Sequence, residues 1–153
     1  MVKRARLELQ ALGGIKLWED GRELLVKPRG ILGRLSALTY EIHDLYGRVS
    51  RVKYGLLGLI EIRKDGRTYS FNPIGSHKFQ YTGQTCSVEG KRSSGLFRIH
   101  QSGRDLASGA IGTKFGNIEY ADDFDLGKEV LVGYGIWALS WFTVMGAFIG
   151  GGV

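Results

Sequence analysis

The stretch that decides the fold is Val130–Val153, VLVGYGIWALSWFTVMGAFIGGGV, which runs for 24 residues without a charged side chain. About 20 apolar residues are enough for a helix to cross a bilayer. A helix that is apolar on every side is also what burial inside a protein produces. The stretch therefore predicts one C-terminal helix, which either lies buried in a folded domain or spans a membrane.

The residues around this stretch favour burial. Trp137 and Trp141 lie in its middle, whereas an aromatic belt would place such residues at both ends of a span. Lys128 is the only cation beside the stretch, although membrane helices usually carry Lys or Arg on the cytoplasmic side. The stretch is preceded by three aspartates, Asp122, Asp123 and Asp125. Their carboxylates suit the positive end of a helix dipole and are predicted to cap the start of the helix. A buried helix is the favoured interpretation, and a tail anchor at 130–153 is the alternative.

The preceding residues alternate with a period of two and are interrupted by glycine-containing turns. Asp20-Gly21 is a typical hairpin signal, and Pro28 predicts the end of a strand because it cannot donate to a ladder. About twelve short strands joined by hairpin-length links are typical of an antiparallel barrel or sandwich. We expect a mainly β fold in which a closed antiparallel barrel of about twelve strands encloses the helix. The expected single domain covers 1–153, with the barrel at 1–121 and the central helix at 122–153.

The charge of the chain is uneven. Residues 1–121 carry 20 basic and 11 acidic side chains, net +9, whereas 122–153 carry one basic and four acidic, net −3. A body of this charge attracts anionic groups, so the expected partner is an anionic membrane surface or an acidic protein. The cations are spread one per strand without clustered stacking aromatics, which disfavours nucleic acid. Nothing in the sequence sets the oligomeric state.

One basic segment stands out as a candidate binding site. Lys27, Arg29 and Arg34 flank the pair Ile31-Leu32 in a glycine-rich connection, and Arg51 and Lys53 alternate on a strand that follows. Cations beside anionic headgroups and apolar side chains in the interface suit a membrane surface. These five residues are therefore predicted to bind lipid or phosphate. The favoured interpretation of the segment itself is that Ile31 and Leu32 close one barrel end and the cations are merely solvated.

Enzymatic chemistry has no support in the sequence. His43, His77 and His100 have no Cys, Asp or Glu partner at metal-ligand spacing. Cys86 alternates on a strand and is predicted to be a buried apolar residue. No nucleophile elbow, phosphate loop or H-E-x-x-H motif occurs. We expect a non-enzymatic protein without catalytic residues, cofactor or metal. A single cysteine and a charged N-terminal segment predict a cytoplasmic location, with a single-pass membrane protein as the alternative.

Two stretches resemble the tubby-like superfamily, which includes tubby proteins, phospholipid scramblases and LURP-one-related proteins. One is Leu38–Val49, LTYEIHDLYGRV, similar to the Y-E-I-x-D-x-x-G hairpin, and the other is Tyr120–Glu129, YADDFDLGKE, which leads into the apolar helix. The resemblance implies a twelve-stranded barrel around a C-terminal helix, and the LURP-one-related members are the most similar in size. The cysteine-rich and proline-rich segments of scramblases are missing, so lipid scrambling is not expected. The acidic segment lies where scramblases are thought to bind calcium, but helix capping is the favoured interpretation.

Overall fold

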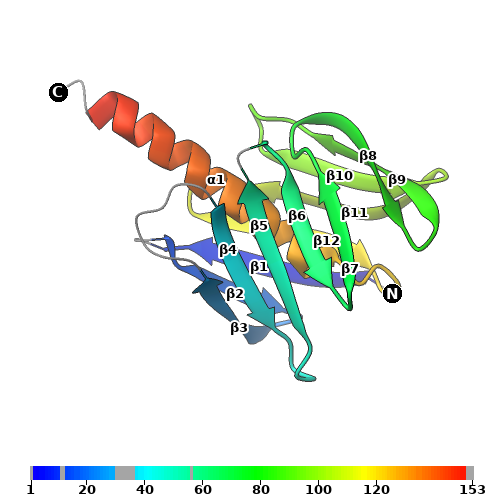
Figure 1. Ribbon diagram of the computed structural model, residues 1–153. Helices are drawn as coiled ribbons and strands as arrows, with labels where there is room; N and C mark the ends of the chain where they lie inside the picture. Colours follow the sequence, from blue (N-terminus) through cyan, green and yellow to red (C-terminus); the bar gives the residue numbers. More distant parts are fainter. Residues whose placement is uncertain (1, 11–12, 30–36, 56, 151–153) are drawn as a thin grey trace.

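The computed structural model describes residues 2–10, 13–29, 37–55 and 57–150, with only the backbone described for 37–38 and 141–150. Twelve strands are followed by one helix, α1 (Gly127–Gly150) (Figure 1). The strands are β1 (Val2–Leu9), β2 (Ile15–Glu19), β3 (Arg22–Arg29), β4 (Ala37–His43), β5 (Val49–Gly55), β6 (Ile60–Lys64), β7 (Arg67–Phe71), β8 (Gly75–Tyr81), β9 (Gln84–Gly90), β10 (Leu96–Gln101), β11 (Arg104–Ile111) and β12 (Phe115–Ala121). The predicted mainly β fold with a C-terminal helix is confirmed.

The strands form one antiparallel sheet that curves into a nearly closed barrel. Their order is β7-β6-β5-β4-β3-β2-β1-β12-β11-β10-β9-β8, and β1 pairs with β12. The sheet edges β7 and β8 meet through aromatic side chains instead of a ladder: Tyr69 and Phe71 of β7 contact Phe79 of β8, with ring centroids 6.4 and 5.4 Å apart. The barrel therefore has one seam, between β7 and β8, that side chains close.

Tight two-residue turns connect several of the hairpins. Asp20 and Gly21 both have positive φ, 49° and 82°, and Asp65 and Gly66 repeat this with 52° and 73°. Two successive residues with positive φ form the turn whose twist matches that of paired strands, and Asp-Gly is a preferred sequence for it. The hairpin predicted at Asp20-Gly21 is confirmed, because β2 pairs with β3 from Glu19 opposite Arg22.

Pro28 does not end β3, so that prediction was wrong. The strand continues to Arg29, and Pro28 lies opposite Tyr40 of β4. β2 pairs with β3 only as far as Leu24, so the second half of β3 is bonded to a neighbour along one side only. A strand edge tolerates proline because the missing N–H can lie on the unpaired side. Arg29 consequently stands on a strand of the barrel, not in a loop.

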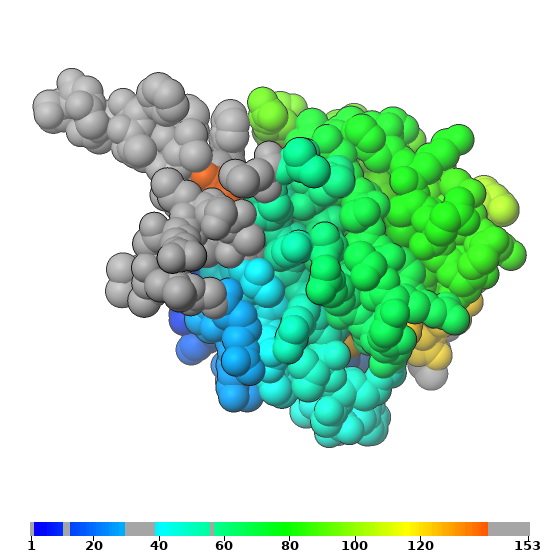
Figure 2. Space-filling view, in the orientation of Figure 1, coloured from blue at the N-terminus to red at the C-terminus, as the bar shows by residue number. Residues whose placement is uncertain are grey.

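The first half of α1 is buried against the inward side chains of the strands. It contacts β1, β2, β5, β6, β11 and β12, and a small orange patch of it is visible on the face shown in Figure 2. Its buried apolar residues are Val130, Leu131, Val132, Tyr134, Ile136, Trp137 and Ala138. Tyr134 stacks on Phe97 with ring centroids 3.9 Å apart and donates a hydrogen bond to the Pro73 carbonyl at 2.8 Å. The helix and the strands thus share one core.

The membrane-span interpretation concerns 130–153, part of which lies outside the described side chains. Within the described portion of the chain, no helix is both long enough and apolar enough to cross a bilayer. In Figure 1 the backbone of α1 continues past the ends of the strands.

Glycines let α1 approach the strands closely. A Cβ on Gly133 would lie 2.5 Å from Ile60 Cγ2, and one on Gly135 would lie 3.0 Å from a Leu7 methyl group. The contact at Gly133 is too short for a real side chain, and the contact at Gly135 is tight enough that Leu7 would have to shift slightly.

A leucine at Gly133 is expected to destabilise the fold. Overpacking of a dense core costs about 1–3 kcal/mol, because neighbours must leave their preferred rotamers. Gly133→Leu should therefore lower the thermal midpoint measured by circular dichroism. Ser140→Leu, at a half-buried position on the same helix, is the control and should change the midpoint little. Equal midpoints for the two variants would contradict the close packing of α1 on Ile60.

Candidate functional site

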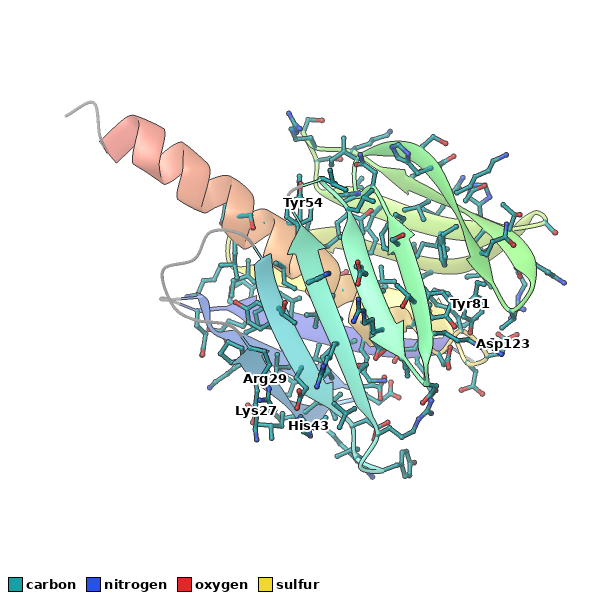
Figure 3. All side chains as sticks on the ribbon, viewed as in Figure 1. Lys27, Arg29, His43, Tyr54, Tyr81 and Asp123 are labelled. Atoms are coloured by element: carbon teal, nitrogen blue, oxygen red, sulfur yellow. The ribbon has the colours of Figure 1, made fainter. Side chains whose placement is uncertain are left out.

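Strand register brings four of the five predicted binding residues onto one outer surface. Lys27 of β3 lies opposite Glu41 of β4, which lies opposite Arg51 of β5. Two residues along each strand, Arg29, Thr39 and Lys53 form a second row. Since alternate residues of a strand share a face, both rows point away from the core. Figure 3 shows Lys27 and Arg29 near His43 on this side. Arg34 and the pair Ile31-Leu32 lie outside the described residues.

Glu41 is the anchor of this surface. Its side chain is only 6% exposed although it points outward, because cationic side chains cover it. Arg29 donates two hydrogen bonds to its carboxylate, at 3.1 and 3.2 Å, and Arg51 Nε lies 3.6 Å away. His43 Nε2 is 2.8 Å from the other oxygen. The Arg29 hydrogen bond, helped by His43, lowers the pKa of Glu41 against the opposing effect of burial. The carboxylate therefore fixes several cations in place.

The basic surface extends one strand further than the sequence predicted. Arg63 of β6 lies opposite Arg51, and its Nε is 3.0 Å from Glu61, which is also 3.5 Å from Lys53 Nζ. A small cavity of about 140 Å³ lies among Thr39, Arg51, Val52, Lys53, Glu61 and Arg63. The basic face is defined here as Lys27, Arg29, Arg51, Lys53 and Arg63 with Glu41 and Glu61. Its five cations exceed its two carboxylates by three charges, which suits an anionic ligand.

A second charged cluster, which the sequence did not predict, lies buried where α1 begins. Glu129 is fully buried, and its carboxylate is 3.4 Å from Lys64 Nζ and 3.4 Å from Lys128 Nζ. Ser50 donates a hydrogen bond to Glu129 at 3.0 Å. Lys64 also donates to the Asp125 carbonyl, and Lys128 lies 3.9 Å from Glu19. The buried cluster, defined as Glu19, Ser50, Lys64, Lys128 and Glu129, thus connects α1 with β2, β5 and β6.

The charges of this buried cluster balance one another, which indicates a structural role. Burial lowers the pKa of Lys64, and the attraction of Glu129 offsets it only in part. For Lys128, burial also opposes the charge, but attraction to Glu129 and Glu19 outweighs it and the pKa is raised. The two lysines balance two carboxylates beside a cavity of about 350 Å³ at this end of the barrel. Charges that satisfy one another hold the start of α1 in place.

The three aspartates before α1 bind side chains of the barrel and do not cap the helix. The first helical bond runs from the Val130 N–H to the Leu126 carbonyl. Asp123 accepts two hydrogen bonds from Arg104, at 2.9 and 2.6 Å, and Asp125 accepts one from the Tyr81 hydroxyl at 2.7 Å. Figure 3 shows Tyr81 and Asp123 on the same side of the barrel. No hydrogen bond described for 122–130 joins these carboxylates to an N–H of α1, so the capping prediction was wrong.

The cysteine and the histidines were the remaining candidates for catalysis or metal binding. Cys86 is fully buried, as predicted, and burial raises the pKa of its thiol. His43 contacts Glu41 on the basic face, and His100 Nε2 lies 3.5 Å from Glu89. Over the part of the chain that the structure describes, no three His, Cys, Asp or Glu side chains are grouped as metal ligands.

Comparison of the chain with models of protein families, with curated proteins and with solved structures gives no match. The resemblance to the tubby-like superfamily thus rests on the quoted sequence stretches alone. The functional argument has to be made from the geometry of the basic face and of α1.

Proposed function

We propose that this chain is a non-enzymatic binding domain that attaches peripherally to membranes by binding anionic phospholipid on its basic face. The observation that carries the proposal is the strand register, which gathers Lys27, Arg29, Arg51 and Lys53 on one surface with Arg63. Each cation near an anionic membrane contributes about 1 kcal/mol of attraction. Several cations held on rigid strands bind without a large loss of side-chain or loop freedom.

The architecture that we propose for this function is tubby-like, with α1 enclosed by the barrel as its central helix. It is supported by the burial of the first half of α1 and by its contacts with six strands on both sides of the β1–β12 pair. In this architecture the helix, and not a ligand, occupies the centre of the barrel. Binding is therefore assigned to the outer surface.

Removal of two central cations is expected to weaken binding. Lys27→Ala combined with Arg51→Ala should reduce affinity for phosphatidylglycerol vesicles about 30-fold, since each cation contributes about 1 kcal/mol. Co-sedimentation with vesicles at low and high salt measures the effect, and salt should weaken the wild type more than the variant. Lys78→Ala combined with Arg98→Ala removes two exposed cations from β8 and β10 and serves as the control. Equal losses in both variants would contradict a site on the basic face.

Glu41 is expected to restrain the basic face, so its neutralisation should strengthen binding. Its pKa is lowered from 4.5, so the carboxylate stays charged at neutral pH and is protonated only as the pH falls below that value. Glu41→Gln releases Arg29 and Arg51 for lipid and adds one net positive charge. We expect severalfold tighter binding to phosphatidylglycerol vesicles at pH 7. Wild-type binding should rise toward that of the variant as the pH falls below about 4.5; weaker binding by Glu41→Gln would oppose the assignment.

Neutral vesicles provide the decisive comparison. Phosphatidylcholine alone should bind weakly, and adding phosphatidylglycerol should increase binding in proportion to its charge. If both kinds of vesicle bind equally weakly, the lipid proposal fails. An acidic protein would then be the remaining partner for the basic face.

A further inference from the structure

Consecutive strands of the barrel alternate in direction, so their connections alternate between two ends. The start end, where α1 begins, carries the connections 20–21, 44–48, 65–66, 82–83, 102–103 and 122–126. The exit end, from which the backbone of α1 projects in Figure 1, carries, within the described residues, 10, 13–14, 57–59, 72–74, 91–95 and 112–114. The sequence of each connection therefore reveals the composition of one end of the molecule.

The connections at the two ends carry opposite charge. The start-end connections hold one cation, Arg48, and six carboxylates: Asp20, Asp44, Asp65, Asp122, Asp123 and Asp125. The described residues of the exit-end connections hold no carboxylate and three cations: Lys91, Arg92 and Lys114. Arg29 of the basic face is the last residue of β3 and borders the exit end. An anionic surface attracts the exit end and repels the start end.

Exposed apolar side chains occur at both ends, so charge decides between them. Leu57, Leu96 and Phe115 lie in or directly after exit-end connections, and Leu57 is 87% exposed. Lys114 Nζ lies 5.4 Å from the centre of the Phe115 ring, so a cation and an exposed aromatic ring stand together there. At the start end Leu45 and Tyr46 are also exposed, Tyr46 to 89%, but they lie among the carboxylates. The exposed apolar groups of the exit end therefore lie among cations, whereas those of the start end lie mostly among carboxylates.

The length of α1 fits one leaflet of a bilayer. Its last ten residues, 141–150, read WFTVMGAFIG and include no charge. At about 1.5 Å per residue, ten helical residues extend about 15 Å, which is half of a hydrocarbon core about 30 Å thick. A helix end of this length enters a bilayer from one side and reaches its middle.

We infer that the protein docks on an anionic bilayer end-on, with the exit end against the headgroups and the second half of α1 inserted into one leaflet. The inference rests on the proposed function, and it adds the orientation and the inserting element. Arg29 and Lys53 then lie nearer the headgroups than Lys27 and Arg51, by two residues of strand or about 7 Å. Lys91 and Lys114 contact the headgroups directly.

Two nearly equally exposed positions test the orientation. Single cysteines replacing Leu57 at the exit end and Tyr46 at the start end are labelled with a polarity-sensitive fluorophore, while the native Cys86 is buried. Phosphatidylglycerol vesicles should shift the emission of the Leu57 label to the blue and leave the Tyr46 label unchanged. A shift at Tyr46, or at both positions, overturns the inference. A blue-shifted Leu57 label without vesicles, together with a dimer in solution, would mean that a second copy covers this end.

Matched charge removal at the two ends gives a second test. Lys91→Gln with Lys114→Gln should reduce affinity for the same vesicles about 30-fold, whereas Arg22→Gln with Arg67→Gln should change it less than threefold. Both pairs are exposed and alter the net charge equally. Equal losses overturn end-on docking.

A charge in the projecting helix tests insertion. Ala147→Lys should weaken binding about tenfold, because a lysine is costly in the hydrocarbon region. Unchanged affinity would exclude insertion of α1. If none of these variants affects binding but removal of Lys27 and Arg51 does, the protein docks side-on and only the orientation fails. If no variant binds anionic vesicles differently from neutral ones, the proposed function fails as well.

Discussion

Deletion of residues 130–153 is expected to abolish the fold. The described part of the deleted segment buries six large apolar side chains, those of Val130, Leu131, Val132, Tyr134, Ile136 and Trp137. At about 1.5–3 kcal/mol each, their burial contributes about 9–18 kcal/mol, which is as large as the whole stability of a typical domain. The truncated chain should show no cooperative thermal transition by circular dichroism and should aggregate.

A shorter deletion separates the two halves of α1. Removal of 141–153 keeps the buried half, so a cooperative transition should remain. The same variant should lose binding to anionic vesicles if the projecting half inserts. A folded, monomeric protein after deletion of 130–153 would instead support the tail-anchor interpretation and would contradict the shared core of α1 and the strands.

Replacement of Glu129 by alanine is expected to cost about 3–5 kcal/mol of unfolding free energy. The substitution leaves Lys64 and Lys128 buried beside each other without the carboxylate that lies 3.4 Å from each ammonium group. Loss of one partner from a buried ion pair is far more costly than loss of a surface pair, because the remaining charge is neither paired nor solvated. Urea unfolding followed by circular dichroism measures the change.

A double substitution tests whether charge is the cause. Glu129→Met combined with Lys64→Met replaces the pair by apolar groups of similar size and should recover much of the lost stability. Arg48→Met, which breaks the exposed Arg48–Asp65 pair, is the control and should leave the urea midpoint nearly unchanged. A double variant that is no more stable than Glu129→Ala would show that the side chain matters for its shape and not for its charge.

Most of the fold follows from the sequence because the relevant forces are local. Alternation places every second residue of a strand in the core, as with Leu7 and Leu9 or Ile60 and Ile62, and the Asp-Gly pairs demand a tight turn. Pro28 was misread because its effect depends on the neighbouring strand. The sequence does not tell that β2 stops pairing before the proline is reached.

The site was predictable only in part. The sequence points to two nearby basic segments, which contain Lys27, Arg29, Arg51 and Lys53. Strand register depends on pairing between residues far apart in the sequence, and it brings these four residues onto one surface. Arg63 belongs to the same surface but lies on β6, one strand beyond β5 with Arg51 and Lys53. The burial of Lys64 could have been predicted from the sequence. Lys64 follows Ile60 and Ile62 at the two-residue spacing of side chains that face the core. Its partner Glu129 is 65 residues away in the sequence.

The edge strands β7 and β8 touch through Tyr69, Phe71 and Phe79, while their facing backbone groups form no ladder with each other. Because no ladder joins the two strands, the sheet can open along this seam. In the proposed architecture the strands can therefore close around α1 from the side, and the helix does not have to be threaded through a closed barrel. We therefore expect the backbone amides of β7 and β8 that border this seam to show the fastest hydrogen exchange among the strand amides.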